Sequence, residues 1–407
     1  MSGSESMYIE NKEFNDLKNF YEDHLKTMLL PFWMERAIDY EYGGYYTCFD
    51  NSGEKLLSYD KYTWSQGRMV WVFSKLSTME CFSKEEQIEF LKLANMGTKF
   101  LMKNCLLENG NCTFLMERDG TPKRQAPNMD YDTSFYADCF VVLGLSKYAQ
   151  VSGDLSALDF AKKLYNSIKK RIDSDTFKSE PYPVPGGYRS HGIYMIMLNT
   201  THELATALRE MKDEKYEEID GYAEGYMREI MDNFVSKDYV IQEMVRQDNT
   251  HIYDTLYGRY INPGHTLECM WFITHYAMEK EYRDIIDIGL KIVENTFEKG
   301  WDREYGGILL FADRDGGRPR GSIEGIEEQA MCQKILNDWD NKLWWTHSEM
   351  LYTLLLFHKL SGDAKFLELY EQAHEYVFST FPNQNREIGK WIQIRDRKGD
   401  PEQKVVA

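Results

Sequence analysis

Apolar residues recur at steps of three and four along most of the chain, which is the pattern of helices with one buried face. The clearest example lies between residues 11 and 30, where the apolar face carries Phe14, Leu17, Tyr21, Leu25 and Met28. A capping box at residues 83–86, Ser-Lys-Glu-Glu, predicts the start of another helix. Strand-like alternation is short and confined to residues 45–49 and 308–311. The sequence therefore predicts a helical protein with only short strands.

Turn signals recur at a steady interval and divide the chain into similar units. The turn residues are Gly53, Gly120, Gly187, Asn249, Gly316 and Gly399, at steps of 67, 67, 62, 67 and 83 residues. A longer unit, Trp33 followed by Gly43-Gly44, returns as Trp301 followed by Gly306-Gly307. Six units of about 66 residues, each a helical pair with an irregular arm, indicate a repeat fold, because one pair cannot bury its apolar stripe alone.

We expect from these units an all-α fold, an (α/α)6 toroid in which inner and outer helices form a six-hairpin barrel. Short β-hairpin arms should gather at one end and surround a central cleft. An open solenoid of helical pairs is the alternative, although long arms fit regular solenoid stacking poorly. The chain has no linker or low-complexity stretch, so residues 1–407 are interpreted as one domain.

The composition excludes several classes of protein. The chain carries 48 Lys and Arg against 66 Asp and Glu, and its net charge of −18 argues against nucleic acid or a membrane surface as the main partner. It has no apolar run of about 20 residues and no secretory signal, so a cytoplasmic location is expected. The seven cysteines are scattered without a CxxC pair, which predicts reduced thiols and no metal site.

Aromatic residues make up 14% of the chain, including 9 Trp and 28 Tyr. Tyrosine and tryptophan combine a flat apolar face with a polar group, so they stack well on sugar rings. A large helical core rich in aromatic residues is the alternative interpretation.

The most distinctive local motif spans residues 259–271. Asn262-Pro263-Gly264 interrupts the chain and a helical pattern follows, so His265 is expected in the first turn of a new helix. The positive end of the helix dipole there should lower the pKa of the imidazole and favour the neutral ring that a general base needs. Glu268, three residues later, could orient that ring. A histidine packed in the core is the alternative.

Three further clusters contain candidate functional residues. In residues 342–349, two adjacent tryptophans precede His347 and Glu349, although one tryptophan could face outward and the histidine could be structural. Arg68 follows Gly67 between two tryptophans and could clamp a sugar oxygen or form a buried ion pair. Tyr136 could offer its phenol to the cleft or lie in the core.

These motifs together resemble the N-acylglucosamine 2-epimerase family, which includes cellobiose and mannose 2-epimerases and aldose–ketose isomerases. The matching pieces are Phe32-Trp33, Gly43-Gly44, Trp64-x-Gln-Gly67-Arg68-x-x-Trp71, Asn262-Pro-Gly-His265-x-x-Glu268-x-x-Trp271, Trp301-Asp with Gly306-Gly307, and Lys342-Leu-Trp344-Trp345-x-His347-Ser-Glu349. The resemblance implies an (α/α)6 barrel that interconverts N-acylglucosamine and N-acylmannosamine, or a related free sugar. A histidine removes the proton at C2 of the opened sugar, and an enediolate forms and is reprotonated.

The resemblance also implies roles for individual residues. His265 is one of two catalytic histidines, Arg68 stabilises the carbonyl or enediolate oxygen, and Glu268 supports His265. Substrate-binding positions are Trp64, Tyr136, Asn199, Trp344, Trp345 and Glu349. No cofactor is expected, and a nucleotide effector, which some relatives bind, has no support in the sequence. The expected partner is a sugar substrate, with a homodimer as a possible assembly.

The sequence departs from the family near its C-terminus. The family carries its second histidine in a Phe-His-x-Pro/Ala-Arg segment, and the chain stops at Ala407 before such a segment. We therefore expect the last inner helix to be missing. Truncation, replacement by His347, or sugar binding without turnover would each account for this.

Two other classes of protein compete with an epimerase. Glycoside hydrolases also use six-hairpin toroids, and Glu268 with Glu349 could be their pair of catalytic carboxylates. A sugar- or protein-binding module without chemistry is the third reading.

Overall fold

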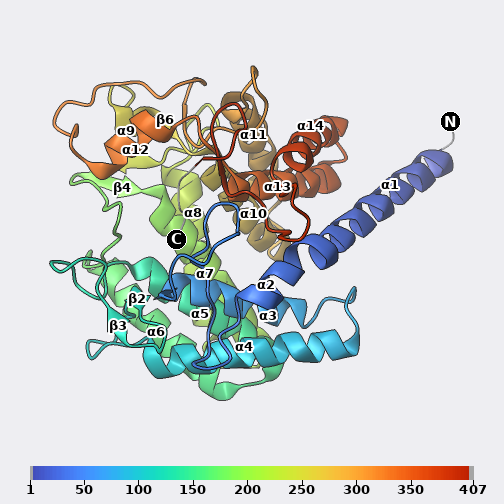
Figure 1. Ribbon diagram of the computed structural model, residues 1–407. Coiled ribbons are helices and arrows are strands. Elements are labelled where there is room, and N and C mark those ends of the chain that lie inside the picture. The colour runs from blue at the N-terminus through green and yellow to red at the C-terminus, as the bar shows by residue number, and fades with distance from the viewer. Residues whose placement is uncertain (1–2, 403–407) are drawn as a thin grey trace.

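The computed structural model describes the backbone of residues 3–402 and the side chains of residues 14–402 (Figure 1). Five helical hairpins dominate the described chain, each an inner helix followed by an outer helix. The inner helices are α3 (Thr63–Leu76), α5 (Phe135–Ser152), α7 (His191–Glu210), α10 (Pro263–Glu279) and α13 (Trp344–Ser361). The outer helices are α4 (Lys84–Asn104), α6 (Leu155–Asp173), α8 (Tyr216–Asn233), α11 (Arg283–Gly300) and α14 (Ala364–Thr380).

The inner helices pack side by side in chain order, α3 on α5, α5 on α7, α7 on α10 and α10 on α13. Most residues of the inner helices α5 and α10 are buried. The outer helices α6 and α11 each bury one face, as amphipathic surface helices do. Shorter helices complete the set: α2 (Leu30–Arg36), α9 (Leu256–Arg259), α12 (Ala330–Asp338) and the π-helix η1 (Leu25–Leu29). The helical ring predicted from the repeat is confirmed.

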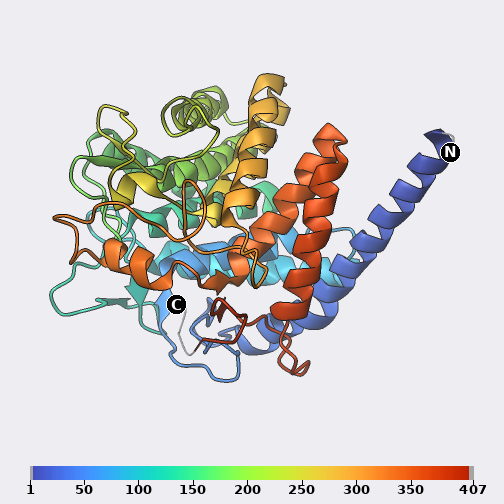
Figure 2. The ribbon, with the colours of Figure 1, turned by 90° about the horizontal axis from the view of Figure 1, so that it is seen from above.

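The long N-terminal helix α1 (Gly3–His24) takes an outer place beside α14. A hydrogen bond of 2.7 Å links the hydroxyl groups of Tyr21 and Tyr370, and the indole N–H of Trp391 donates to His24 Nε2 at 2.7 Å. The free end of α1 points away from the other helices (Figures 1 and 2). Residues 3–402 supply five inner helices, so the sixth inner position that the repeat predicts is not filled by the described chain.

Short antiparallel strands lie at one end of four of the five helical hairpins, and in the α5–α6 hairpin a single bridge joins Ser134 to Ser179. The pairs are β4 (Tyr188–Ser190) with β5 (Met244–Arg246), β6 (Tyr260–Ile261) with β7 (Ala312–Asp313) and β8 (Lys342–Leu343) with β9 (Ile394–Arg395). In the first hairpin β1 (Lys61–Tyr62) pairs with β2 (Leu115–Met116), which also pairs with β3 (Pro122–Lys123). One strand of each pair leads directly into an inner helix, so the arms lie at the N-terminal ends of α3, α7, α10 and α13.

The turns found in the sequence lie in these arms. All six repeating turn residues, Gly53 to Gly399, have a positive φ between 67° and 97°. Glycine and asparagine tolerate this left-handed conformation better than other residues, which explains why they recur there. The predicted arms are thereby confirmed.

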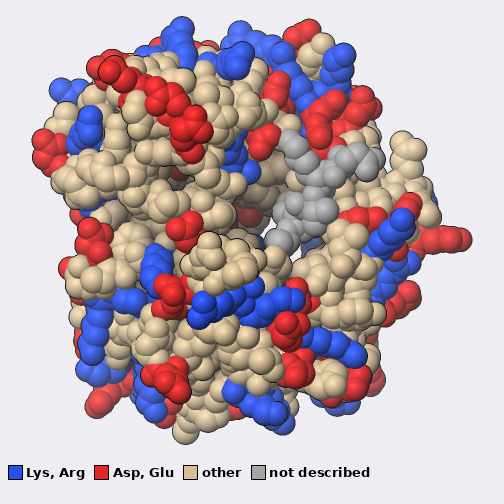
Figure 3. All heavy atoms as spheres, turned by 60° about the vertical axis from the view of Figure 1, so that its left-hand side comes forward, with Lys and Arg blue, Asp and Glu red and all other residues tan. Residues whose placement is uncertain are grey.

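Charged side chains of both signs are mixed over the face seen in Figure 3, as expected for a solvated surface. Among the described helices, none is both long and apolar enough to cross a lipid bilayer.

Candidate active site

Most candidate residues lie in the first two turns of the inner helices, next to the arms. Arg68, Glu268 and Glu349 are each the sixth residue of their helices α3, α10 and α13, so they lie at the same depth in the ring. All three keep access to solvent, although the residues that follow them are largely buried. Solvent therefore reaches a charged centre between the inner helices.

A close approach of two helices sets the position of Arg68. A Cβ atom on Gly67 would overlap the carbonyl oxygen of Phe140, and one on Gly144 would overlap the carbonyl oxygen of Gly67. Glycine at both positions therefore allows α3 and α5 to touch. The contact brings the Arg68 guanidinium carbon to 4.0 Å from the centre of the Phe140 ring, which suits a cation–π interaction.

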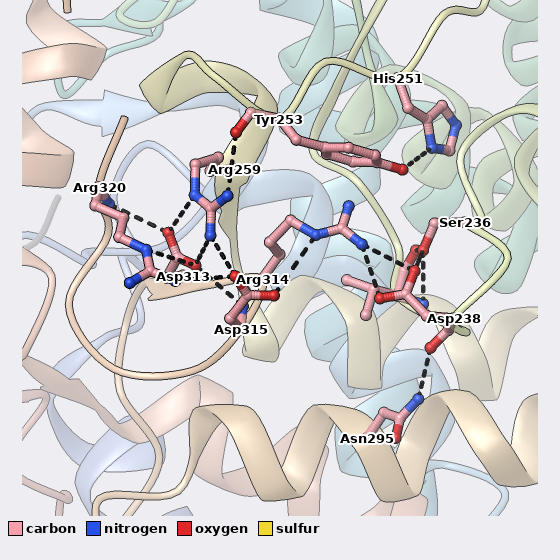
Figure 4. Close-up of polar contacts among 11 residues, drawn as sticks. Ser236, Asp238, His251, Tyr253, Arg259, Asn295, Asp313, Arg314, Asp315 and Arg320 are labelled. Carbon is pink, nitrogen blue, oxygen red and sulfur yellow. Dashed lines mark hydrogen bonds and ion pairs between the residues drawn. The ribbon is translucent and has the colours of Figure 1, made fainter. Parts of the chain in front are cut away.

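His265 occupies the first turn of α10, as predicted. The Asn262 side chain caps this helix by accepting a hydrogen bond from the His265 backbone N–H at 3.1 Å. The strand before it is anchored where Arg259 donates both Nε and Nη2 to the buried carboxylate of Asp313, at 3.0 and 2.6 Å (Figure 4). The Trp345 ring lies 5.7 Å from the His265 ring, so it forms one wall beside the imidazole.

Glu243 holds the imidazole of His265. Its Oε2 lies 3.2 Å from His265 Nδ1, and its Oε1 lies 3.4 Å from Nδ1 of His191. Burial raises the pKa of Glu243, but the two histidines outweigh this and lower it to about 2. Burial lowers the pKa of His265, and the charge and hydrogen bond of Glu243 reverse that effect, so the pKa is raised. The sequence-based expectation of a lowered pKa for His265 was wrong, because a carboxylate in contact outweighs the helix dipole.

Two carboxylates share the centre with Arg68. Burial raises the pKa of Glu268, and His265 and Arg68 oppose this effect. Burial and the negative charge of Glu268 raise the pKa of Glu349 to about 8, although the Trp271 indole donates to Glu349 Oε2 at 2.6 Å. Burial also lowers the pKa of the Arg68 guanidinium, while Glu268 and Glu349 act in the opposite direction. The raised pKa favours the protonated form of Glu349 at neutral pH, and that form can donate a hydrogen bond.

His347 lies away from this centre and requires a correction. Its side chain is completely buried, Nε2 accepts from the backbone N–H of Ile308 at 2.9 Å, and Nδ1 lies 2.6 Å from the carbonyl oxygen of Leu343. Burial lowers its pKa to about 3. With both ring nitrogens bound to backbone groups, His347 has no nitrogen left for a substrate, so the structure argues against its predicted catalytic role.

The remaining predicted residues are divided between the centre and the arms. Tyr136, the second residue of α5, is partly exposed, and Glu243 is close enough to help raise the pKa of its phenol. Asn199 is partly exposed two turns further along α7, without a hydrogen bond to the other site residues in the described chain. Trp64 packs against Phe114, with ring centres 5.0 Å apart, and Trp344 packs against the core between α10, α13 and α14.

Residues 44–407 match the family of N-acylglucosamine 2-epimerases (GlcNAc 2-epimerases). The chain belongs to the N-acylglucosamine 2-epimerase family. It is 29% identical to the N-acylglucosamine 2-epimerase of Rattus norvegicus over 388 residues, which cover 91% of this chain and 82% of the relative. It is 24% identical to a cellobiose 2-epimerase of Dictyoglomus turgidum over 410 residues, which cover 95% of this chain and 92% of the relative.

Solved structures of sugar epimerases share the fold of this family member. A sugar epimerase from a ruminal bacterium superimposes with a TM-score of 0.75 at 19% identity, covering 94% of this chain and 92% of that one. Cellobiose 2-epimerase from Bacillus thermoamylovorans superimposes with a TM-score of 0.73 at 20% identity, covering 97% of this chain and 95% of that one. At such identities the likeness concerns the fold, and it confirms the predicted (α/α)6 toroid.

Sequence reasoning missed two residues of this epimerase-family site, Glu243 and His191. Glu243 lies in the short apolar run Val240-Ile-Gln-Glu-Met-Val, where it resembles an exposed strand position. His191 stands between Ser190 and Gly192 without a motif around it. Their partnership with His265 depends on contacts between α7, the strand β5 and α10, which no local pattern shows. Among the described residues, no group of three or more His, Cys, Asp or Glu is arranged to hold a metal ion.

Proposed function

We propose that this protein is a carbohydrate 2-epimerase in which His265 removes the proton at C2 of a ring-opened sugar. The observation that carries this proposal is the state of His265. Its side chain is 33% exposed at the solvent-accessible centre, and its Nδ1 is held by Glu243, which leaves Nε2 for the substrate. A carboxylate on one nitrogen orients the ring and stabilises the imidazolium that forms when the other nitrogen takes a proton.

Groups around His265 suit the charge that develops on the sugar. Loss of the C2 proton gives an enolate whose negative charge lies mainly on the oxygen of C1. The guanidinium of Arg68 offers several N–H donors to such an oxygen, and a protonated Glu349 offers one O–H. The face of Trp345 offers an apolar surface for the sugar carbons.

N-acylglucosamine and N-acylmannosamine are the first substrates to test. Four mammalian N-acylglucosamine 2-epimerases are 28–29% identical to this chain over 91% of its length, whereas a cellobiose 2-epimerase that aligns over a similar length is 24% identical. Mannose, glucose and cellobiose are the second set. A cytoplasmic location and a homodimer stay predictions from the sequence.

The decisive experiment follows deuterium entering at C2 in heavy water by proton NMR. This exchange needs only proton removal by His265, so it reports the first half of the reaction even where net epimerisation is slow. His265→Asn keeps a contact to Glu243 without the catalytic nitrogen and should abolish exchange. His275→Asn, on the outer part of α10, serves as the matched control and should exchange at the normal rate. Exchange that survives in His265→Asn would overturn the proposal.

A glycoside hydrolase is the second candidate, because Glu268 and Glu349 form a pair of buried carboxylates with raised pKa values. A family 76 mannosidase of Bacteroides thetaiotaomicron shares the fold, with a TM-score of 0.57 at 11% identity. Release of reducing ends from mannose oligosaccharides that is lost in Glu268→Gln and Glu349→Gln, yet kept in His265→Asn, would favour this candidate.

A further inference from the structure

A second histidine lies behind the carboxylate that holds His265. His191 is the first residue of α7, its side chain is completely buried, and its backbone N–H donates to the carbonyl oxygen of Glu243 at 2.9 Å. Its Nδ1 lies 3.4 Å from Glu243 Oε1. Both atoms are buried and neither has a hydrogen-bond partner with good geometry in the described chain, so each is the nearest polar group with which the other can pair.

The contact between His191 and Glu243 lies in an enclosed part of the protein. Glu243 is 5% exposed, and the ring of Phe234 lies 6.0 Å from that of His191. Four titratable groups interact with the charge of Glu243: Tyr136 from α5, Tyr260 from β6, and His265 and Cys269 from α10. Glu268 acts on His265, and Arg68 acts on Glu268. In such an enclosed site a hydrogen bond to a carboxylate is worth more than in water.

We propose that His191 is a positioning residue for proton transfer: its Nδ1–H holds Oε1 of Glu243, aims Oε2 at His265, and limits how strongly Glu243 stabilises the protonated form of His265. With the proton on Nδ1, His191 takes part of the carboxylate's negative charge into a hydrogen bond. Without it, all of that charge acts on His265 from a buried site. This arrangement keeps the imidazole oriented by a carboxylate while it still releases its proton.

The direction of the effect follows from this balance. In His191→Phe the ring volume stays but the donor is lost, so the pKa of His265 should rise by about half a unit to one unit. His191→Asn places an amide N–H where Nδ1 stood and should bring the pKa back toward the wild-type value. Glu243→Gln removes the charge itself, so the pKa of His265 should fall.

The test measures the titration of His265 directly, by NMR of its imidazole C–H in the whole protein without sugar. The signal among the nine histidines is assigned by its loss in His265→Asn. The expected result is an upward shift in His191→Phe, a return in His191→Asn, and little effect of His191→Phe in the Glu243→Gln background. No shift in His191→Phe, a downward shift, or the same shift without the Glu243 carboxylate would overturn the inference.

A kinetic measurement connects the contact between His191 and Glu243 to the reaction. This measurement rests on the proposed function. The acid limb of the C2 exchange rate, where His265 becomes protonated, should move to higher pH in His191→Phe by the same amount as the NMR titration. Since the titration needs no substrate, a protein that shows the shift but exchanges no sugar proton would contradict the proposed function alone. If His191→Phe exchanges the C2 proton but the acid limb of its exchange rate does not move, only the role of His191 is contradicted.

Discussion

Glu349 illustrates how the site controls the charge of a single side chain. Its pKa is raised to about 8 by burial and by the charge of Glu268, so it is protonated at neutral pH. If the protonated form is the one that helps the reaction, the C2 exchange rate should fall as the pH rises through about 8. Glu349→Gln keeps a hydrogen-bond donor but cannot ionise, so its exchange rate should be flat there.

A neighbouring substitution provides the control for Glu349. The indole of Trp271 lowers the pKa of Glu349 by donating to its carboxylate, so Trp271→Phe should move the alkaline limb to higher pH. The same limb in Glu349→Gln as in the wild type would assign that titration to another group.

His347 leads to a prediction about stability. Its Nε2 accepts the backbone N–H of Ile308, so His347→Phe should lower the free energy of unfolding by about 1–3 kcal/mol. That buried N–H loses its acceptor, whereas the carbonyl of Leu343 keeps the Thr346 hydroxyl as a donor. Folded protein at low temperature should keep its C2 exchange rate. Loss of exchange with unchanged stability would restore the catalytic reading.

The difference in the free energy of unfolding between wild type and His347→Phe should depend on pH. The pKa of His347 is about 3 in the folded protein against 6.5 for the free side chain, so the unfolded chain binds the extra proton. The stabilising contribution of His347 is therefore complete above pH 6.5 and is lost as the pH falls toward 3. The gap between wild type and His347→Phe in urea unfolding should narrow over that range.

At the scale of elements, the packing of α3 on α5 sets the place of Arg68. Gly67→Ala would drive a methyl group into the backbone of Phe140, so we expect a loss of about 2–4 kcal/mol in the free energy of unfolding and a displaced guanidinium. Gly221→Ala in α8 is the matched control, since no atom lies within 4 Å of its added methyl group. That helical substitution should stabilise the protein by up to about 1 kcal/mol, and equal effects at the two positions would refute the packing argument.

The elements also show what the sequence could and could not predict. Helical periodicity, the capping box at Ser83 and the spaced turns are local signals, and the helix at Ser83, the turns and five of the six inner helices that they predicted are present in the described chain. His265 was predictable because Asn262-Pro263-Gly264 marks a helix start in any fold. The contact of Glu243 with His191 and His265 was not, because it joins side chains 22 to 52 positions apart whose own neighbours in sequence are unremarkable.

At the scale of the molecule, the loop between α2 and β1 meets the C-terminal arm of the described chain. The Asn51 side chain accepts from the backbone N–H groups of Gln393 and Ile394 at 2.7 and 3.0 Å, and donates to the carbonyl oxygens of Ile394 and Glu402. Asn51→Ala should therefore lower the free energy of unfolding by about 2–4 kcal/mol, because several buried backbone groups lose their partner at once. Asn109→Ala, on an exposed loop, should change it by less than about 0.5 kcal/mol, and equal losses would show that the contact between the Asn51 loop and the C-terminal arm adds no stability.

The arrangement of the inner helices has a consequence for the whole site. Arg68, Tyr136, His191, His265 and Glu349 stand near the starts of five different inner helices, so the amino ends of these helices converge on one small volume. Each such end carries a partial positive charge of roughly half a proton. In a protein with a net charge of −18, the helix ends thus add a positive contribution to the potential where a sugar anion would form. Backbone peptides, which no substitution removes, would share in stabilising it.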